Sequence, residues 1–487
     1  MPAPTAAVDV GTPGRRDVLL FCAAAIGVGL VYAVWPWFAL SMGALALVAV
    51  LAVRAPDYGF VVVLGLFGLE GTLKERMTFG STPLPWSGTT IGAAVLDVCL
   101  LIALAGVLVR DRSTLVDAWR NAGRLLRVGV ALLAAWLGLA VIAIPQSGDV
   151  KQGVDGFRLI HWYVLAALGG VALARAAPRV LDLLLVLLLV ITAYAALRAL
   201  IGPSAIERAY ALSRLGVTRY GSAFRDVGSF SGAVGLASYA ATAGVFAFAL
   251  ALFSPRLRIL CGALFACALV AVVASYARAA LVAMVVGLVV ATAFALSQAR
   301  FTQRQKAFAV GAVVVALVCG VVGTIVASHS SPQVRSRARI FVHPLGDESL
   351  HIRLRTWRTS LHDSVRHPLG AGLGTVGRAS TLSGQPGVTT DNTYLQVLRQ
   401  QGFLGLAAFL AAVLALVVGL IVGVRRAPHD RKPIGVAAVS ACLCFLVLAV
   451  AGEYAEQPGK VLMWTFLGLA FGAVCLPPAR VGAEERR

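Results

Sequence analysis

A succession of long apolar runs constrains this chain more than any other feature of its sequence. The runs lie near 18–34, 38–53, 59–70, 90–109, 128–144, 159–174, 180–201, 232–253, 259–274, 279–297, 307–327, 403–424, 434–451 and 461–476. Several are shorter than the roughly 20 residues that a helix perpendicular to a bilayer needs, so we expect about 12–14 transmembrane helices. Hydrophobic residues make up 59% of the chain and charged residues 13%, which excludes a soluble globular enzyme. The predicted fold is all-α, a polytopic membrane protein with a long, partly helical outer-face loop.

Basic residues indicate how these spans are oriented. Arginine and lysine concentrate in short loops on one side of the bundle, for example at Arg110 with Arg112, Arg256 with Arg258, and Arg425 with Arg426. The positive-inside rule places such loops in the cytoplasm. An even number of spans then puts both termini there, and the long loops face outward.

The apolar runs and polar intervals predict five segments. They are a cytoplasmic tail (1–17), a transmembrane region (18–327), an extracytoplasmic loop subdomain (328–402), C-terminal transmembrane helices (403–476) and a second cytoplasmic tail (477–487). All eight cysteines fall in apolar segments, and none has zinc-ligand spacing with a histidine. We therefore predict neither a structural disulfide nor a Cys/His metal site.

The interval from Arg353 to Gly402 is the longest motif-rich polar stretch. Its first part has helical periodicity, with one apolar face made by Leu350, Leu354, Trp357, Leu361 and Val365, and an adjacent basic face made by Arg355, Arg358, His362 and Arg366. This pattern predicts an interfacial amphipathic helix over 350–366.

A glycine-rich turn and a helix start follow. Gly370, Gly372 and Gly374 allow positive φ values and leave backbone N–H groups able to meet an anion. Asp391 and Asn392 then suit the N-cap of a helix that leads into the next apolar run.

These motifs resemble the C-terminal signature of the O-antigen ligase and O-antigen polymerase superfamily. The resembling residues are Arg353 with Trp357, the His-Pro-Leu-Gly-x-Gly-Leu-Gly turn from His367, and the Asn-x-Tyr-Leu-Gln segment from Asn392. The motifs cover roughly a tenth of the chain. One position departs from the pattern, because ligases of this family usually carry histidine immediately before that asparagine, and here the residue is Asp391.

The resemblance implies a membrane glycosyltransferase of surface-polysaccharide biosynthesis in the bacterial plasma (inner) membrane. Its partners would be a donor oligosaccharide linked to a polyprenyl diphosphate such as undecaprenyl diphosphate, a glycan or lipid acceptor, and the bilayer. Transfer would be metal-independent and inverting, with no cofactor. The net charge of +20 indicates that the protein binds anionic lipid headgroups or an anionic substrate. We do not expect a nucleic acid as a partner.

Arginines in the outward segments are the candidates for holding a diphosphate, since a planar guanidinium matches phosphate oxygens. The resemblance points to Arg225 first and Arg219 second, just before a Gly-x-Phe turn, and to Arg278 at the head of a span. A solvated basic surface against anionic lipid remains the alternative. Arg225 could instead pair with Asp226 or Glu207, and Arg278 could extend to the interface.

Asp391 is the candidate catalytic base, because an acceptor hydroxyl needs a group that orients and deprotonates it. The alternative is an ordinary N-cap aspartate. Further substrate contacts are expected from Arg353, Arg358, Trp357, Asn392, Tyr394 and His367, with Trp357 and Tyr394 also suited to interfacial anchoring. Asp97, inside a span, is either functional or hydrogen-bonded to a neighbouring helix. Glu70, Glu453 and Glu456, at span ends, are expected to be solvated.

Three acceptors fit one chemistry: a lipid-linked glycan for a polymerase, a lipid A core for a ligase, or a protein hydroxyl for an O-oligosaccharyltransferase. The aspartate at the histidine position favours the polymerase. Two other classes stay open, namely a peptidoglycan polymerase of the shape, elongation, division and sporulation family, and a lipid or small-molecule transporter or flippase. An enzyme should bring Arg225, Arg278 and Asp391 to one cavity, whereas scattering would favour the transporter.

Overall fold

The structure is a computed structural model. It describes residues 36–79, 88–176, 178–204, 208, 219–220, 223–297, 348–382 and 388–477, together with scattered positions between 302 and 322. The expected run at 18–34 and both predicted tails, apart from residue 477, lie outside the described residues. The run at 307–327 lies largely outside them.

The first half of the chain is helical throughout its described part. Its elements are α2 (Pro36–Arg54), α3 (Pro56–Gly68), α4 (Glu70–Phe79), α5 (Gly88–Arg110), α6 (Arg112–Asn121), α7 (Arg124–Ala143), η1 (Pro145–Ser147), α8 (Val150–Ile160), η2 (Trp162–Leu165), α9 (Ala166–Leu173) and α10 (Pro178–Ile201). Proline stands in the first turn of α3 and of η1, where a helix needs no N–H donor.

The described residues from 219 onward form a hairpin and the remaining described helices. The elements are β1 (Arg219–Tyr220), β2 (Ala223–Phe224), α13 (Ala233–Phe253), η3 (Pro255–Leu257), α14 (Arg258–Ala274), α15 (Arg278–Leu296), α18 (Glu348–Arg366), α19 (Arg378–Leu382), α20 (Thr393–Arg426), α21 (Lys432–Leu448), η6 (Tyr454–Glu456) and α22 (Gly459–Cys475). β1 and β2 pair antiparallel, with Arg219 opposite Phe224. Helix α20 is broken at Gly402, where φ is 70° and ψ is −170°.

The prediction of an all-α polytopic membrane protein is confirmed. Among the described residues, eight helices are long and apolar enough to cross a bilayer, and four shorter apolar helices accompany them. Their total of twelve lies within the expected range of spans. The helix predicted over 350–366 is also confirmed as α18.

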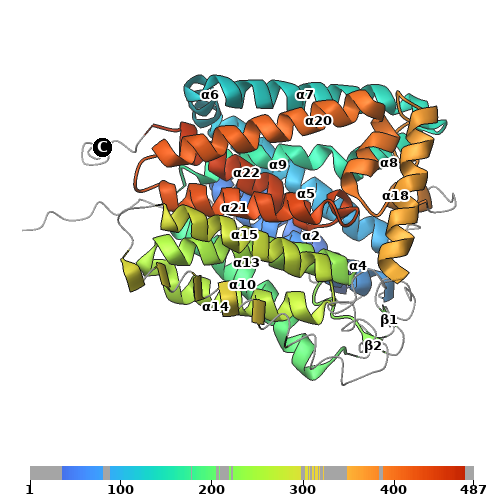
Figure 1. Ribbon diagram of the computed structural model, residues 1–487. Coiled ribbons are helices and arrows are strands. Elements are labelled where there is room, and N and C mark those ends of the chain that lie inside the picture. Colours follow the sequence, from blue (N-terminus) through green and yellow to red (C-terminus); the bar gives the residue numbers. More distant parts are fainter. Residues whose placement is uncertain are drawn as a thin grey trace, which may run out of the picture.

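The helices lie side by side, and α10, α14, α15, α21 and α22 pack against α13, whose apolar span is 94% buried (Figure 1). Close packing is possible because small residues line the contacts. Between α9 and α22, for example, a Cβ at Gly468 would lie 1.9 Å from the carbonyl oxygen of Ala167, and one at Gly170 would lie 2.0 Å from that of Thr465. These two glycines therefore let the helix backbones touch.

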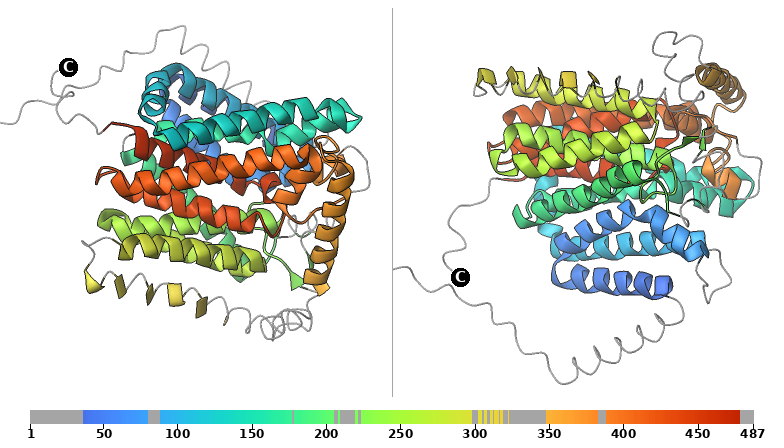
Figure 2. Two further views of the ribbon diagram at one scale, coloured as in Figure 1. Left: turned by 45° about the horizontal axis from the view of Figure 1, so that its top comes forward. Right: turned by 90° about the horizontal axis from the view of Figure 1, so that it is seen from below.

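The bundle has two distinct ends. Helix α18 crosses one of them, next to α4, α8 and the β1–β2 hairpin, and we call it the α18 end (Figures 1 and 2). The opposite end, the α6 end, gathers the basic short loops. There Arg110 donates a hydrogen bond to the backbone carbonyl of Arg54, and Arg175 donates one to Thr114.

Candidate functional site

Arg225 is fixed at the turn between α14 and α15. The side chain is half-buried, and its Nε donates a hydrogen bond of 3.0 Å to the backbone carbonyl oxygen of Ser275. Tyr276 follows with a φ of 54°, a left-handed conformation that reverses the chain, and α15 begins at Arg278. The structure thus holds Arg225 against the turn that leads directly to half-buried Arg278.

A small cavity opens beside this turn. It has a volume of about 160 Å³, and its lining includes Arg198, Arg225, Asp226 and Tyr276. Arg278 and Asp391 are not among its lining residues. Arg225, the first predicted diphosphate-binding residue, and Arg198, near the end of α10, therefore line the same cavity. The cavity does not contain the whole predicted site.

Tyr454 lies within electrostatic range of both Arg225 and Arg353. The tyrosine lies in η6 and is 3% exposed. Burial raises the pKa of its hydroxyl to about 12, while the guanidinium groups of Arg353 and Arg225 act in the opposite direction. Two arginines from separate segments, one on α18 and one after β2, therefore lie around the same loop between α21 and α22.

Asn392 performs the capping function at the start of α20. Its Oδ1 accepts hydrogen bonds from the backbone N–H groups of Tyr394 at 2.8 Å and Leu395 at 3.1 Å. Asp391 precedes the cap with a φ of 46°, which is rare for a residue other than glycine. The carboxylate of Asp391 is therefore not the N-cap of α20.

The loop between α21 and α22 holds the segment that carries Asp391. Glu453 Oε1 accepts hydrogen bonds from Thr390, from its backbone N–H at 2.6 Å and from its hydroxyl at 2.9 Å. Burial, together with the nearby charges of Glu456 and Asp391, raises the pKa of Glu453 to about 8, although the hydrogen bonds from Thr390 act in the opposite direction. Trp357 adds a contact from α18, since its indole N–H donates to the carbonyl of Asp391 at 3.4 Å.

Glu456 ties the same loop to the glycine-rich segment. It accepts hydrogen bonds from the backbone N–H of Arg378 at 2.7 Å and from the side-chain amide of Gln396 at 2.6 Å. The expectation that Glu70, Glu453 and Glu456 are solvated is wrong. Glu70 is 2% and Glu456 5% exposed, and Glu453 is partly buried. Glu70 has a nearby partner in Lys74 and a distant one in Ser231, and the partners of Glu453 and Glu456 come from distant segments. A span-end position in the sequence cannot reveal such distant partners.

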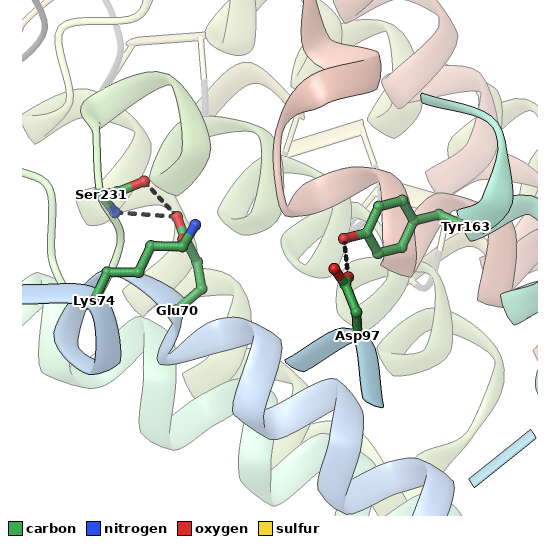
Figure 3. Close-up of polar contacts among 5 residues, drawn as sticks. All are labelled: Glu70, Lys74, Asp97, Tyr163 and Ser231. Atoms are coloured by element: carbon green, nitrogen blue, oxygen red, sulfur yellow. Dashed lines mark hydrogen bonds and ion pairs between the residues drawn. The ribbon is translucent and has the colours of Figure 1, made fainter. Parts of the chain in front are cut away.

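Two buried polar contacts lie deeper at the α18 end (Figure 3). Glu70 forms an ion pair with Lys74 and accepts hydrogen bonds from Ser231, from its hydroxyl at 2.6 Å and its backbone N–H at 3.2 Å. Asp97 accepts a 2.6 Å hydrogen bond from the hydroxyl of Tyr163. The latter contact supports the reading of Asp97 as a side chain bound to a neighbouring helix.

Lys460 and Arg158 complete this polar layer. Arg158 pairs with Asp97. Lys460, only 3% exposed, places its Nζ 4.0 Å from the centroid of the Tyr163 ring and donates to the carbonyl of Leu159. The sequence analysis did not select Arg158 or Lys460 as functional candidates. Two features of the sequence could have identified them. Each is a basic residue at the edge of an apolar run, and another apolar run contains an acidic residue, Asp97, that needs a partner.

The glycine-rich turn has a structural role. Gly370, Gly372 and Gly374 adopt positive φ values of 92°, 94° and 74°, as predicted. The N–H groups of Gly370 and Gly372 are not bare, however, which corrects that expectation for these two residues. The N–H groups of residues 370–373 donate to backbone carbonyls of residues 367, 399, 400 and 143 respectively. The turn therefore clasps α18 to α7 and α20.

The other predicted residues take different positions. Arg358 and His367 are exposed on α18 and just after it. The hydroxyl of Tyr394 donates to the carbonyl of Leu446 at 2.9 Å, which anchors α20 to α21. Arg219 lies in β1 opposite Phe224, and its side chain is outside the described part of the structure.

Comparison with known families identifies the segment that carries most of this site. Residues 263–410 match the family described as O-Antigen ligase. This match supports the resemblance to the O-antigen ligase and polymerase superfamily. The matched segment includes Arg278, Arg353 and Asp391, whereas Arg225 precedes it. No curated protein matches the chain. The match supports glycosyl transfer in general as the activity class of this multi-pass membrane protein.

Proposed function

We propose that this protein transfers or polymerises an oligosaccharide from a polyprenyl-diphosphate donor onto a glycan or lipid acceptor at the outer face of a bacterial plasma membrane. One observation carries the proposal. The hydrogen bond from Arg225 to Ser275 places a half-buried guanidinium beside the turn that ends at Arg278. The two residues joined by this hydrogen bond are 50 positions apart in the sequence. Two separate segments of the chain thereby supply cations to one region.

These arginines suit a diphosphate leaving group. As the bond between the sugar C1 and the phosphate oxygen breaks, negative charge develops on the diphosphate, and preorganised cations stabilise that charge. Arg278 stands at the N-terminus of α15, where the helix dipole adds positive potential. Arg353, which shares the surroundings of Tyr454 with Arg225, would supply a third guanidinium. In this proposal guanidinium groups provide the charge neutralisation, without a metal ion.

Asp391 is the proposed base. The acceptor hydroxyl oxygen attacks C1 from the face opposite the diphosphate, a new C1–O bond forms, and the C1–O bond to phosphate breaks. The hydroxyl proton passes to the Asp391 carboxylate, and the bonding electrons leave with the diphosphate. A single displacement of this kind inverts the anomeric centre. The capping role of Asn392 supports the assignment, because it leaves the Asp391 carboxylate available for this task.

The exposed face of α18 supports an interfacial position for the α18 end. Leu361 and Val365 are 48% and 69% exposed, whereas Ser360 and Ser364 on the packed face are each 1% exposed. An outward apolar face suits the headgroup boundary of a bilayer. We place the α18 end outside the cell and the α6 end, with its arginines, in the cytoplasm, which is also the side that the sequence predicts for both termini. The subdomain 328–402 would then cover the site and exclude water.

Purified protein with undecaprenyl-diphosphate oligosaccharide provides the test. The assay measures release of the lipid diphosphate and the mass of the glycan product, with lipid-linked glycan, lipid A core and a protein hydroxyl offered as separate acceptors. Arg278→Ala should reduce release by about 100-fold or more. Arg112→Ala is the matched control, an exposed arginine at the α6 end. Full activity of Arg278→Ala with the authentic donor would overturn the proposed mechanism.

A further inference from the structure

A second and larger cavity lies at the α6 end, far along the helices from the proposed catalytic region. Its volume is about 680 Å³, within the range of small-molecule sites. It is bounded by the turn between α9 and α10, by η3 after α13, and by the start of α21. None of the residues proposed for glycosyl transfer lines it.

The cavity has an apolar interior. Leu184, Leu250 and Leu469 line it from α10, α13 and α22. Leu184 lies six residues into α10, which begins at Pro178, so the cavity reaches about 9 Å into the bundle at 1.5 Å per residue. A soluble ion alone would leave the leucine-lined interior of the cavity unfilled.

The mouth of the cavity is cationic. Arg175, Arg256 and Arg431 line it, together with the two carboxylates Asp182 and Asp430. Each guanidinium is oriented by the protein. Arg256 pairs with Asp182, Arg175 donates to Thr114 at 3.2 Å, and Arg431 donates to the carbonyl of Leu476 at 2.7 Å. Since a guanidinium has five N–H donors, such contacts position the group and leave capacity to bind an anion.

Helix termini of both kinds line the same place, since the C-terminal ends of α9 and α13 lie there as well as the N-terminal ends of α10 and α21. The net cationic character therefore comes from the arginines. Pro178 and Pro433 line the cavity and belong to the first turns of α10 and α21. The N-terminal ends of these two helices each contribute a partial positive charge, which the C-terminal ends of α9 and α13 offset. Burial lowers the pKa of Arg431, Asp430 raises it, and Arg175 lowers it further. Arg431 thus experiences the repulsion of another cation, which a bound anion would relieve.

We propose that this cavity binds the phosphate of an anionic phospholipid at Arg175, Arg256 and Arg431, with the start of an acyl chain along the leucines. A lipid fits better than a free anion because its head and tail match the cationic mouth and the apolar interior. The location also agrees, because the mouth lies at the ends of membrane-length helices, at the level of headgroups. The proposal rests on the membrane-spanning fold and is independent of glycosyl transfer.

Lipid titration of the full-length protein in a neutral detergent tests this site. Phosphatidylglycerol, phosphatidylcholine and inorganic phosphate are added separately, and the unfolding temperature and the bound lipid, by native mass spectrometry, are measured. Phosphatidylglycerol should raise the unfolding temperature and remain bound, whereas phosphatidylcholine should do neither. The double variant Arg175→Gln/Arg256→Gln should weaken phosphatidylglycerol binding by about tenfold or more.

Two further variants keep the test decisive. Arg179→Gln/Arg258→Gln removes two exposed arginines of the same end that do not line the cavity, and should bind lipid like the wild type. Asp182→Asn added to Arg256→Gln avoids an uncompensated carboxylate, and should fold while still binding lipid weakly. Equal loss in the Arg179/Arg258 control, or an equal thermal shift with inorganic phosphate, would overturn the proposal.

Discussion

Asn392 Oδ1 accepts a 2.8 Å hydrogen bond from the backbone N–H of Tyr394 and so caps α20. The residue before it, Asp391, takes a left-handed φ of 46° and lies near Glu453, whose pKa it helps to raise. Neighbouring residues thus have separate tasks. Asn392 stabilises the helix start, and the Asp391 carboxylate, which does not cap α20, is the one that we propose as the base.

Asp391→Asn should separate the two tasks. The amide keeps the size of the carboxylate but does not accept a proton at neutral pH, so turnover should fall by about 10²–10⁴-fold. The unfolding temperature should stay close to that of the wild type. Steady-state release of lipid diphosphate and a thermal-unfolding scan check the two parts.

The matched control is Asn392→Ala. Loss of an N-cap should cost about 1 kcal/mol of stability, while the carboxylate of Asp391 remains. This variant should therefore unfold at a lower temperature and retain most of its activity when assayed well below that temperature. If Asp391→Asn is fully active, Asp391 is not the base.

Arg225→Lys tests whether the shape of the guanidinium matters in addition to its charge. Lysine keeps the positive charge but cannot place a planar fork between Ser275 and a phosphate group. We expect activity to fall by about tenfold in Arg225→Lys and by about 10²–10³-fold in Arg225→Ala. The same lipid-diphosphate assay measures both. Equal activity in Arg225→Lys and the wild type would show that a point charge suffices there.

Glu453 should make stability depend on pH. Its pKa is raised from 4.5 to about 8 by burial and by neighbouring carboxylates. Between these values the unfolded chain loses the proton while the folded protein keeps it, so stability should fall as pH rises from about 4.5 to about 8. Glu453→Gln should flatten this slope, as measured by unfolding temperature across that range. An unchanged slope in Glu453→Gln would assign the dependence to other groups.

Much of the fold was predictable because hydropathy acts locally. The apolar runs predicted the membrane helices, and the helical periodicity of residues 350–366 predicted α18. The packed face of α18 was less accessible to sequence reasoning, since the structure buries Ser360 and Ser364 and leaves Leu361 exposed. In a membrane protein, an apolar face can point toward lipid, so periodicity identifies the helix without identifying its packed side.

The site was predictable only in part. The family motif placed Arg278, Arg353 and Asp391 in the segment that also matches the O-antigen ligase family. The loop between α21 and α22 was missed, because Glu453 and Glu456 act through partners some 60 residues away, among them Thr390 and Gln396. Such pairings depend on tertiary contacts, which neither composition nor spacing encodes.

Gly372→Ala distinguishes a structural clasp from an anion site in the glycine-rich turn. Gly372 has a φ of 94°, and an added Cβ would lie 2.3 Å from the backbone nitrogen of Ser147. Left-handed strain costs on the order of 1–3 kcal/mol, and the steric clash adds to it, so the unfolding temperature should fall clearly. Gly262→Ala is the control, because its Cβ meets nothing within 4 Å and alanine favours the helix. If Gly372→Ala kept its unfolding temperature but lost donor binding, the turn would be an anion site after all.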